Sequence, residues 1–291
     1  MNQGIIIKAY NSFYYVQQPD AVVMCTLRGR FKKERFSLLV GDEVQFSLLS
    51  DGKGVIETIL PRRSLLKRPL VANVEQVILT FAAASPDISR LLLDRFLVLA
   101  ESSQLDIVLC INKSELGCAK EIGALTECYR QIGYKVIEVS AKTGQGLEEL
   151  RKTLSGRVSV FSGPSGVGKS SLLNALQPGL NLMTGEVSDK IGRGKHTTRH
   201  AELMPLQGGG FVVDTPGFSL AEITDIAPDE LRHWFREFVE ETADCRFSSC
   251  LHLHEPACGV KNAVAAGKID ALRYENYVAI CNENKVTKKG F

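Results

Sequence analysis

The sequence predicts a multidomain protein in which an N-terminal β-barrel, a central α/β domain and a C-terminal helical domain follow one another. Three observations carry this prediction. Short segments rich in Val, Ile, Phe and Tyr fill residues 1–68, as expected for strands. Strand-like and helix-like segments alternate from Val74 to about Leu220, which is typical of a sheet covered by helices. From Pro228 onward the chain is helical and polar, and a Cys/His cluster interrupts it.

The first domain, residues 1–68, is expected to contain five short strands separated by turns at Pro19-Asp20, Gly41-Asp42 and Asp51-Gly52. Five strands in this length favour a small barrel of the oligonucleotide-binding (OB) type, with an SH3-like barrel or a sandwich as the alternative. Residues 61–69 are interpreted as a basic linker bracketed by prolines. The predicted strands are Gly4–Lys8, Phe13–Val16, Val22–Leu27, Glu43–Leu48 and Val55–Leu60.

The positive charge of the chain is local, because the formal net charge of all 291 residues is only +2. Residues 1–68 contain eleven Lys and Arg against six Asp and Glu, an excess of five. In the run Arg28–Arg35, basic side chains lie on both sides of Phe31, which could stack on a base. An RNA-binding barrel is therefore expected, and a solvated basic loop is the alternative.

The N-terminus lacks the basic start and apolar run of a signal peptide, and no segment approaches the roughly 20 apolar residues of a membrane span. We therefore expect a cytoplasmic protein with no membrane partner.

The second domain, residues 69–222, is expected to form a largely parallel sheet with helices on both faces. The predicted strands are Val77–Phe81, Ile107–Ile111, Lys135–Val139, Val158–Phe161 and Phe211–Val213. The predicted helices are Leu91–Glu101, Glu121–Ile132, Gly146–Leu154 and Lys169–Leu176.

A phosphate-binding loop stands between a predicted strand and a predicted helix. Its residues are Gly163, Pro164, Ser165, Gly166, Val167, Gly168, Lys169 and Ser170, followed by Ser171. Glycines let the backbone wrap phosphates, and the helix N-terminus adds positive potential. Lys169 is expected to reach the β- and γ-phosphates, and Ser170 to bind Mg²⁺.

Two further segments are expected to respond to the terminal phosphate. Asp214 ends an apolar strand, so its carboxylate is predicted to hold Mg²⁺ through water, while the amide of Gly217 meets the γ-phosphate. The segment Gly192–His200 lies between the phosphate loop and Asp214, and Thr198 is its expected Mg²⁺ ligand.

A guanine-reading pair of motifs precedes the phosphate loop. Asn112-Lys113-Ser114-Glu115 follows an apolar strand, and a carboxylate at this position accepts the N1–H and the amine of guanine, which adenine cannot offer. Ser140-Ala141-Lys142 follows the next strand, where the Ala141 amide would meet guanine O6. The usual carboxylate is Asp, so Glu115 is one methylene longer than expected.

The order of these motifs indicates a circularly permuted GTPase domain, because the base-reading motifs ordinarily come after the phosphate loop. Only about 27 residues separate Phe218 from Cys245. Movement of the segment after Asp214 is therefore expected to act directly on the C-terminal domain, the alternative being that the permutation is a neutral accident of history.

The group that positions the attacking water is not the one found in Ras-type enzymes. Phe218 occupies the place of their Gln and cannot orient water. His196 is the predicted catalytic residue, and His200 is the alternative.

The third domain, residues 223–291, carries a predicted zinc site. Cys245, Cys250, His252 and Cys258 supply three thiolates and one imidazole, a closed tetrahedral set typical of one structural Zn²⁺. Spacing alone leaves His254 as an alternative to His252.

The chain resembles the ribosome small-subunit-dependent GTPases, a bacterial family of circularly permuted GTPases. The resemblance spans the whole length and depends on Gly163–Ser171, Gly192–His200, Asp214–Phe218 and the Cys/His set, with Glu115 and Pro164 as departures. It implies that GTP hydrolysis to GDP and phosphate is stimulated by the small (30S) ribosomal subunit during its late maturation. From the basic barrel and the zinc domain beside it, we expect contacts to 16S rRNA. We also expect the protein to be a monomer.

Two other hypotheses remain from the sequence. The first is a nucleotide-locked RNA-binding module with little hydrolysis of its own, which the Phe218 substitution keeps open. The second is a signalling GTPase with a protein partner.

Overall fold

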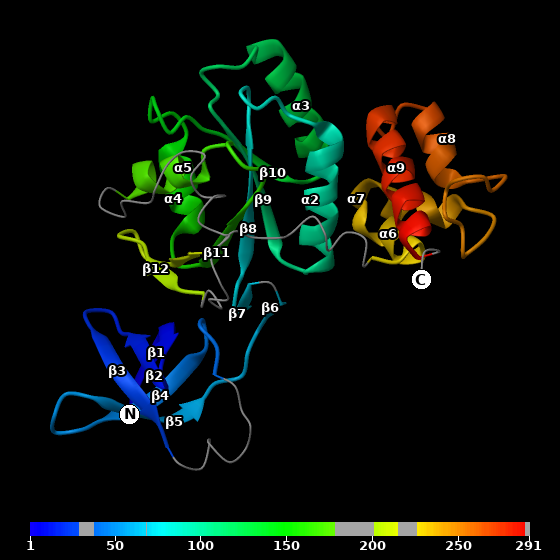
Figure 1. The fold of residues 1–291 in the computed structure, drawn as a ribbon. Helices are drawn as coiled ribbons and strands as arrows, with labels where there is room; N and C mark the ends of the chain where they lie inside the picture. Colours follow the sequence, from blue (N-terminus) through cyan, green and yellow to red (C-terminus); the bar gives the residue numbers. More distant parts are fainter. Residues whose placement is uncertain (29–37, 68, 178–200, 215–225, 289–291) are drawn as a thin grey trace.

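The computed structural model describes residues 1–28, 38–67, 69–177, 201–214 and 226–288, with side chains up to residue 284. Figure 1 shows three units: the N-terminal barrel, the central sheet with its helices, and a C-terminal helical unit beside the central one. The predicted fold class is confirmed.

The first five strands form a closed barrel in the order β1-β2-β3-β5-β4. Its strands are β1 (Asn2–Tyr10), β2 (Phe13–Gln17), β3 (Val22–Leu27), β4 (Glu43–Leu48) and β5 (Gly54–Ile59). All neighbours are antiparallel except β3 and β5, which run parallel and close the barrel. Ile6, Val16 and Phe46 are fully buried inside it. This is the five-stranded arrangement expected for the OB type.

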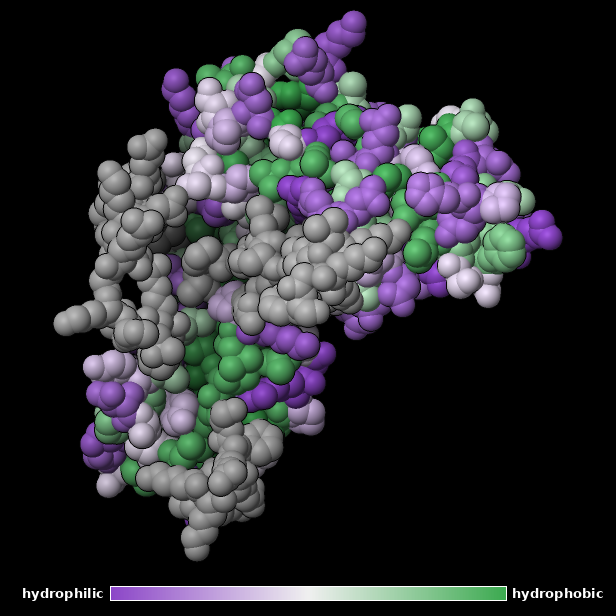
Figure 2. Space-filling view, turned by 45° about the vertical axis from the view of Figure 1, so that its right-hand side comes forward, coloured by the Kyte–Doolittle hydropathy of each residue, from purple (hydrophilic) through white to green (hydrophobic). Residues whose placement is uncertain are grey.

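The segment after the barrel is more ordered than the predicted linker. It contains a hairpin of β6 (Leu65–Lys67) and β7 (Leu70–Ala72), in which Leu66 pairs with Val71 and both are buried. Arg62 donates two hydrogen bonds to the fully buried Asp42, at 2.6 and 2.8 Å. The sequence missed this hairpin because three-residue strands carry little periodic signal. Figure 2 shows apolar surface gathered at this junction of the barrel with the central unit.

The central sheet has the order β10-β9-β8-β11-β13-β12. All pairs are parallel except the edge pair of β12 and β13. The strands are β8 (Gln76–Ala82), β9 (Asp106–Asn112), β10 (Lys135–Glu138), β11 (Val158–Ser162), β12 (Leu203–Pro205) and β13 (Phe211–Val213). Sequence analysis did not predict β12, which is only three residues long and is defined by its pairing with β13.

Helices cover both faces of this sheet (Figure 1). They are α2 (Arg90–Ser102), α3 (Ala119–Gln131), α4 (Leu147–Leu154) and α5 (Lys169–Leu176). On β8, Val77 and Leu79 belong to the core that includes α2, whereas Ile78 belongs to the core that includes α4 and α5. This alternation is the two-residue period of a strand buried on both faces.

The C-terminal unit packs against α2 of the central domain. It comprises α6 (Pro228–Leu231), η4 (Arg232–Trp234), α7 (Arg236–Glu241), η5 (Thr242–Asp244), α8 (Gly259–Ala265) and α9 (Ala271–Lys288). The helix α9 lies along α2, and their contact contains a buried ionic cluster of Asp94, Glu237 and Arg273. The two units therefore share one packed interface. No helix within the described ranges is both long and apolar enough to cross a membrane.

Candidate functional site

The nucleotide motifs gather at one edge of the central sheet. Asn112 is the last residue of β9, Ser140 follows β10, Gly163 follows β11, and Asp214 follows β13. These strands are parallel, so their carboxyl ends meet at the same edge, where ligands bind in open α/β sheets. Motifs that are far apart and permuted in the sequence are therefore neighbours in space.

Asn112 joins three of these motifs through its side chain. The side chain is buried, and its Nδ2 donates to the carbonyl of Val167 in the phosphate loop at 2.9 Å. Its Oδ1 accepts from the Ala141 amide at 3.2 Å. Gly168 is the N-cap residue of α5 and has φ +91°, and a Cβ there would lie 2.6 Å from Asn112 Nδ2. Glycine is therefore required where the phosphate loop passes the Asn112 side chain.

Two lysines bind carbonyl groups of the phosphate loop. The ammonium of Lys169 donates to the carbonyls of Gly163 and Pro164, at 2.8 and 2.7 Å. Lys113 donates to Gly166 at 2.8 Å and also to the carbonyl of Ser85, in the connection between β8 and α2. Sequence reasoning missed Ser85, since a backbone acceptor leaves no signal in residue type.

Glu115 is exposed beside the motif that contains Ser140. The Ser140 hydroxyl, followed by the backbone and by the charges of Lys142 and Lys113, lowers the pKa of the Glu115 carboxyl. The Ser140 hydroxyl itself accepts the Thr143 amide at 3.0 Å. The carboxylate is therefore ionised at neutral pH, which is the form that accepts hydrogen bonds from a base edge.

The remaining predicted nucleotide residues are placed as follows. Ser165 is exposed on the phosphate loop, and Ser170 and Ser171 are half-buried in the first turn of α5. Asp214 is exposed, and its amide donates to the Glu202 carbonyl at 2.8 Å. His196, His200, Thr198, Gly217 and Phe218 lie outside the described residues, as do Arg30 and Phe31 of the basic run.

A cavity of about 520 Å³ lies between the barrel and the amino ends of β11 and β13. Its lining includes Gln17, Glu43, Arg63 and Phe211. The phosphate loop follows the opposite, carboxyl end of β11, so this cavity is separate from the nucleotide motifs.

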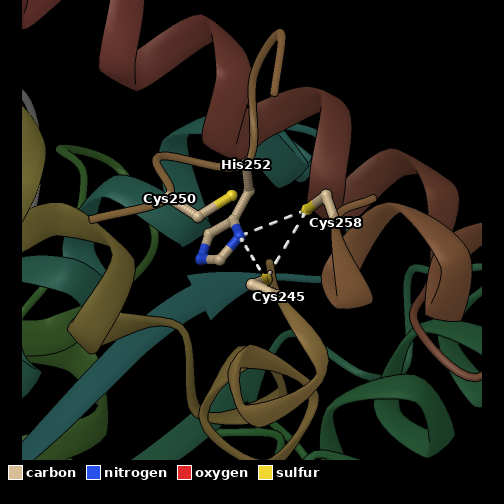
Figure 3. Close-up of side chains that lie close together, drawn as sticks. All are labelled: Cys245, Cys250, His252 and Cys258. Carbon is tan, nitrogen blue, oxygen red and sulfur yellow. Dashed lines mark hydrogen bonds between the residues drawn. The ribbon is translucent and has the colours of Figure 1, made fainter. Parts of the chain in front are cut away.

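The four predicted metal ligands converge in the C-terminal unit (Figure 3), where their ligand atoms all lie within 4.8 Å of one another. The Nδ1 of His252 lies 3.6 Å from Cys245 Sγ and 3.3 Å from Cys258 Sγ. The sulfurs of Cys245 and Cys258 are 3.9 Å apart. Two thiolates about 2.3 Å from a tetrahedral zinc lie about 3.8 Å from each other, so the geometry fits such an ion. His252 is the histidine in the cluster, whereas His254 is exposed.

The pKa values of two of the donors also fit a cation site. Burial raises the pKa of the Cys250 thiol to about 12 and lowers the pKa of His252 to about 4. Cys250 and His252 are therefore neutral at pH 7 before a cation binds, and a cation that binds Cys250 displaces its thiol proton.

The loop that carries these ligands is held by its surroundings. The hydroxyls of Tyr274 and Tyr277 on α9 donate to the carbonyls of His252 and Leu251, both at 2.7 Å. His252 has φ +58°, a conformation that few side chains adopt without such support. Amides also face the sulfurs, because Gly259 donates to Cys245 at 3.3 Å.

Glu255 is a site residue that the sequence analysis missed. It accepts hydrogen bonds from the amides of Leu251 and Leu253, both at 2.8 Å, and of His254 at 3.0 Å. Burial alone would raise the pKa of Glu255, but these amides outweigh burial and lower it to about 2. The carboxylate thus shapes the loop between Cys250 and Cys258, and its only sequence signal is an acid between two ligands.

Comparison with known proteins gives consistent matches over the whole chain. The RsgA N-terminal domain family matches residues 3–56, and the RsgA GTPase family matches residues 59–224. The small ribosomal subunit biogenesis GTPase RsgA of Geobacillus kaustophilus is 52% identical over 291 residues, covering 99% of each chain. The protein of the same name from Caldanaerobacter subterraneus subsp. tengcongensis is 48% identical over 287 residues, covering 99% of this chain and 97% of the relative.

Solved structures agree with these relatives. The crystal structure of YjeQ from Thermotoga maritima has a TM-score of 0.86 at 43% identity, and the match covers 97% of this chain and 98% of that one. The structure of YloQ, described as a circularly permuted GTPase, has a TM-score of 0.83 at 40% identity, covering 98% and 95%.

Proposed function

The chain belongs to the RsgA GTPase family and is a GTP-hydrolysing enzyme, and we propose that it acts on the small ribosomal subunit during late maturation. The observation that carries the proposal is that the Asn112 side chain hydrogen-bonds both to the phosphate loop and to the Ser140–Lys142 motif. In addition, the chain matches proteins named for small-subunit biogenesis over its full length.

Nucleotide binding is proposed to use the sheet edge described above. The amides of the phosphate loop would surround the phosphates, and Lys169 would exchange its two loop carbonyls for phosphate oxygens. The ionised Glu115 would accept the N1–H and amine of guanine, while Asn112 keeps the base-reading and phosphate-binding loops in register.

Magnesium is proposed to bind between the start of α5 and the end of β13. The Ser170 hydroxyl is an oxygen donor of the kind that Mg²⁺ prefers, and Thr198 is the proposed second ligand, from the segment before β12. The Asp214 carboxylate is proposed to hold the ion through water. Bound there, the ion would neutralise charge on the phosphates. We propose that His196 orients the attacking water and that the Gly217 amide meets the γ-phosphate.

The metal of the Cys/His cluster is proposed to be one structural Zn²⁺. The four donors are all supplied by the protein, and three of them are buried, which leaves no position for a substrate. The ion would fix the loop from Cys245 to Cys258 against α9.

Contact with 16S rRNA is proposed to come from the barrel and the zinc domain. Several described basic residues of the barrel and linker are already in ion pairs with acidic side chains, namely Lys8, Arg28, Lys53, Arg62 and Arg63. This supports placing the RNA contact in the remaining basic run, where Arg30, Lys32 and Lys33 lie. We further propose that the protein is a cytoplasmic monomer.

Co-sedimentation with purified 30S particles tests this proposal, alongside multiple-turnover GTP hydrolysis with and without the particles. We expect tighter binding with a non-hydrolysable GTP analogue than with GDP, and faster hydrolysis with particles. Replacing Arg30, Lys32 and Lys33 with Ala should weaken binding and flatten its salt dependence, since fewer counterions are released. Binding without hydrolysis under any condition would instead support a nucleotide-locked RNA-binding module.

A further inference from the structure

An ion pair connects the barrel directly to the segment between the two proposed phosphate-sensing regions. The ammonium of Lys8 on β1 donates to both carboxylate oxygens of Glu202, at 3.0 and 3.2 Å. Glu202 immediately precedes β12, the edge strand of the central sheet, and β1 lies beside β12. The two residues are 194 positions apart in the sequence.

Glu202 also contacts the proposed magnesium site through its main chain. Its carbonyl accepts the amide of Asp214 at 2.8 Å, which extends the β12–β13 pairing beyond Leu203 and Val213. Glu202 stands two residues after His200, the end of the segment that carries His196 and Thr198. One residue thus binds the barrel through its side chain and Asp214 through its main chain.

The barrel strand is shaped to present Lys8 in this position. The pairing of β1 with β2 shifts register between Ile6 and Lys8, so that Ile7 is an extra residue. Ile6 and Ile7 are both buried in consequence, and the side chain of Lys8 emerges toward Glu202. A bulge of this kind re-aims the side chain that follows it.

The pair of Lys8 and Glu202 is partly exposed to solvent. The side chains of Lys8 and Glu202 remain 45% and 40% exposed. Ion pairs with this degree of solvation add little to stability. If β12 had two arrangements, a contact of this size would still bias the equilibrium between them, because a small difference in contact free energy shifts populations several-fold.

We propose that Lys8 and Glu202 are positioning residues through which docking of the barrel on the small subunit raises the rate of GTP hydrolysis. Docking fixes the barrel, the ion pair fixes Glu202, and the Glu202 carbonyl holds Asp214 in the hydrolytic arrangement. This inference depends on the proposed function, since it requires stimulation by the subunit.

The test compares GTP hydrolysis by the full-length protein with and without saturating 30S particles. Lys8→Ala and Glu202→Gln each remove the charge pair, and Glu202→Gln leaves the charge of the barrel unchanged. We expect intrinsic hydrolysis within about twofold of the original protein and subunit-stimulated kcat reduced about fivefold. The matched control is Lys53→Ala, which removes an equally exposed paired lysine from the barrel and should retain full stimulation.

Charge reversal separates coupling from simple loss of a side chain. The double variant Lys8→Glu/Glu202→Lys restores an ion pair and should recover at least half of the lost stimulation. Full stimulation in both single variants at saturating particles, or no recovery in the double variant, overturns the inference while the proposed function stands. If 30S particles do not stimulate GTP hydrolysis by the unmodified protein, both the proposed function and this inference are wrong.

Discussion

Replacing Arg273 with Met should destabilise the contact between the C-terminal and central domains by about 3 kcal/mol. Arg273 is fully buried and donates to Asp94 at 2.6 Å and to Glu237 at 2.7 and 3.0 Å. Burial alone would lower the pKa of Arg273, but these two carboxylates outweigh burial and raise it well above its ordinary value. The guanidinium is therefore charged, and Asp94 on α2 depends on it for neutralisation.

The size of the expected loss of stability depends on the hydrogen bonds that Asp94 retains after the substitution. Removing one partner of a buried ion pair costs about 3–5 kcal/mol, because the other charge is left uncompensated. Asp94 would retain hydrogen bonds from Tyr129 and Asn276, both at 2.6 Å, which places the expected loss near the lower limit. At a urea m-value of about 3 kcal/mol per M, the unfolding midpoint should fall by about 1 M.

Tryptophan fluorescence during urea unfolding measures this change. Trp234 is the single tryptophan of the chain and packs against the core near α2, so its emission reports on the C-terminal domain. Glu283→Ala is the control, since it removes a partly exposed pair with Arg95 at 2.5 Å in the same interface and should cost under about 1 kcal/mol. A midpoint shift in Arg273→Met no larger than that of the control would refute the reasoning.

Other predictions concern the two sites. Glu115→Ala should remove the preference for GTP, so that excess ATP competes with labelled GTP; unchanged discrimination would mean that another group reads the base. Lys169→Ala should abolish binding of labelled GTP altogether, and retention of normal affinity would contradict its proposed phosphate contact. Cys250→Ser should lower the metal content from about one ion per chain and destabilise the C-terminal domain, as measured by metal analysis and Trp234 fluorescence, while GTP affinity persists. A collapse of GTP affinity in that variant would contradict separate sites. His196→Ala should slow hydrolysis on the order of 10²-fold at normal GTP affinity, and an unchanged rate would move the role to His200 or to the ribosome.

The sequence by itself determined the barrel, the alternating sheet, the permuted order of the nucleotide motifs and the Cys/His set that could hold a metal. Each of these depends on local patterns, such as apolar runs with a two-residue period, glycines at tight turns, or cysteines a few positions apart. Strand β3 and helix α5, for example, begin and end where their residues predict, at Val22–Leu27 and Lys169–Leu176. Local signals of this kind survive permutation, because they do not depend on which segment comes first.

Only the tertiary structure decided the contacts between distant segments. His252 and His254 offer the same imidazole at similar spacing, and the choice depends on tyrosines of α9 that fix the loop carbonyls. The strands β6, β7 and β12 are three residues long, so their pairing partners define them. Arg273 lies 179 positions from its partner Asp94, and Lys8 lies 194 positions from its partner Glu202. No local sequence pattern identifies the partner of a charged side chain, because the packing of whole helices and strands against one another decides which charges meet.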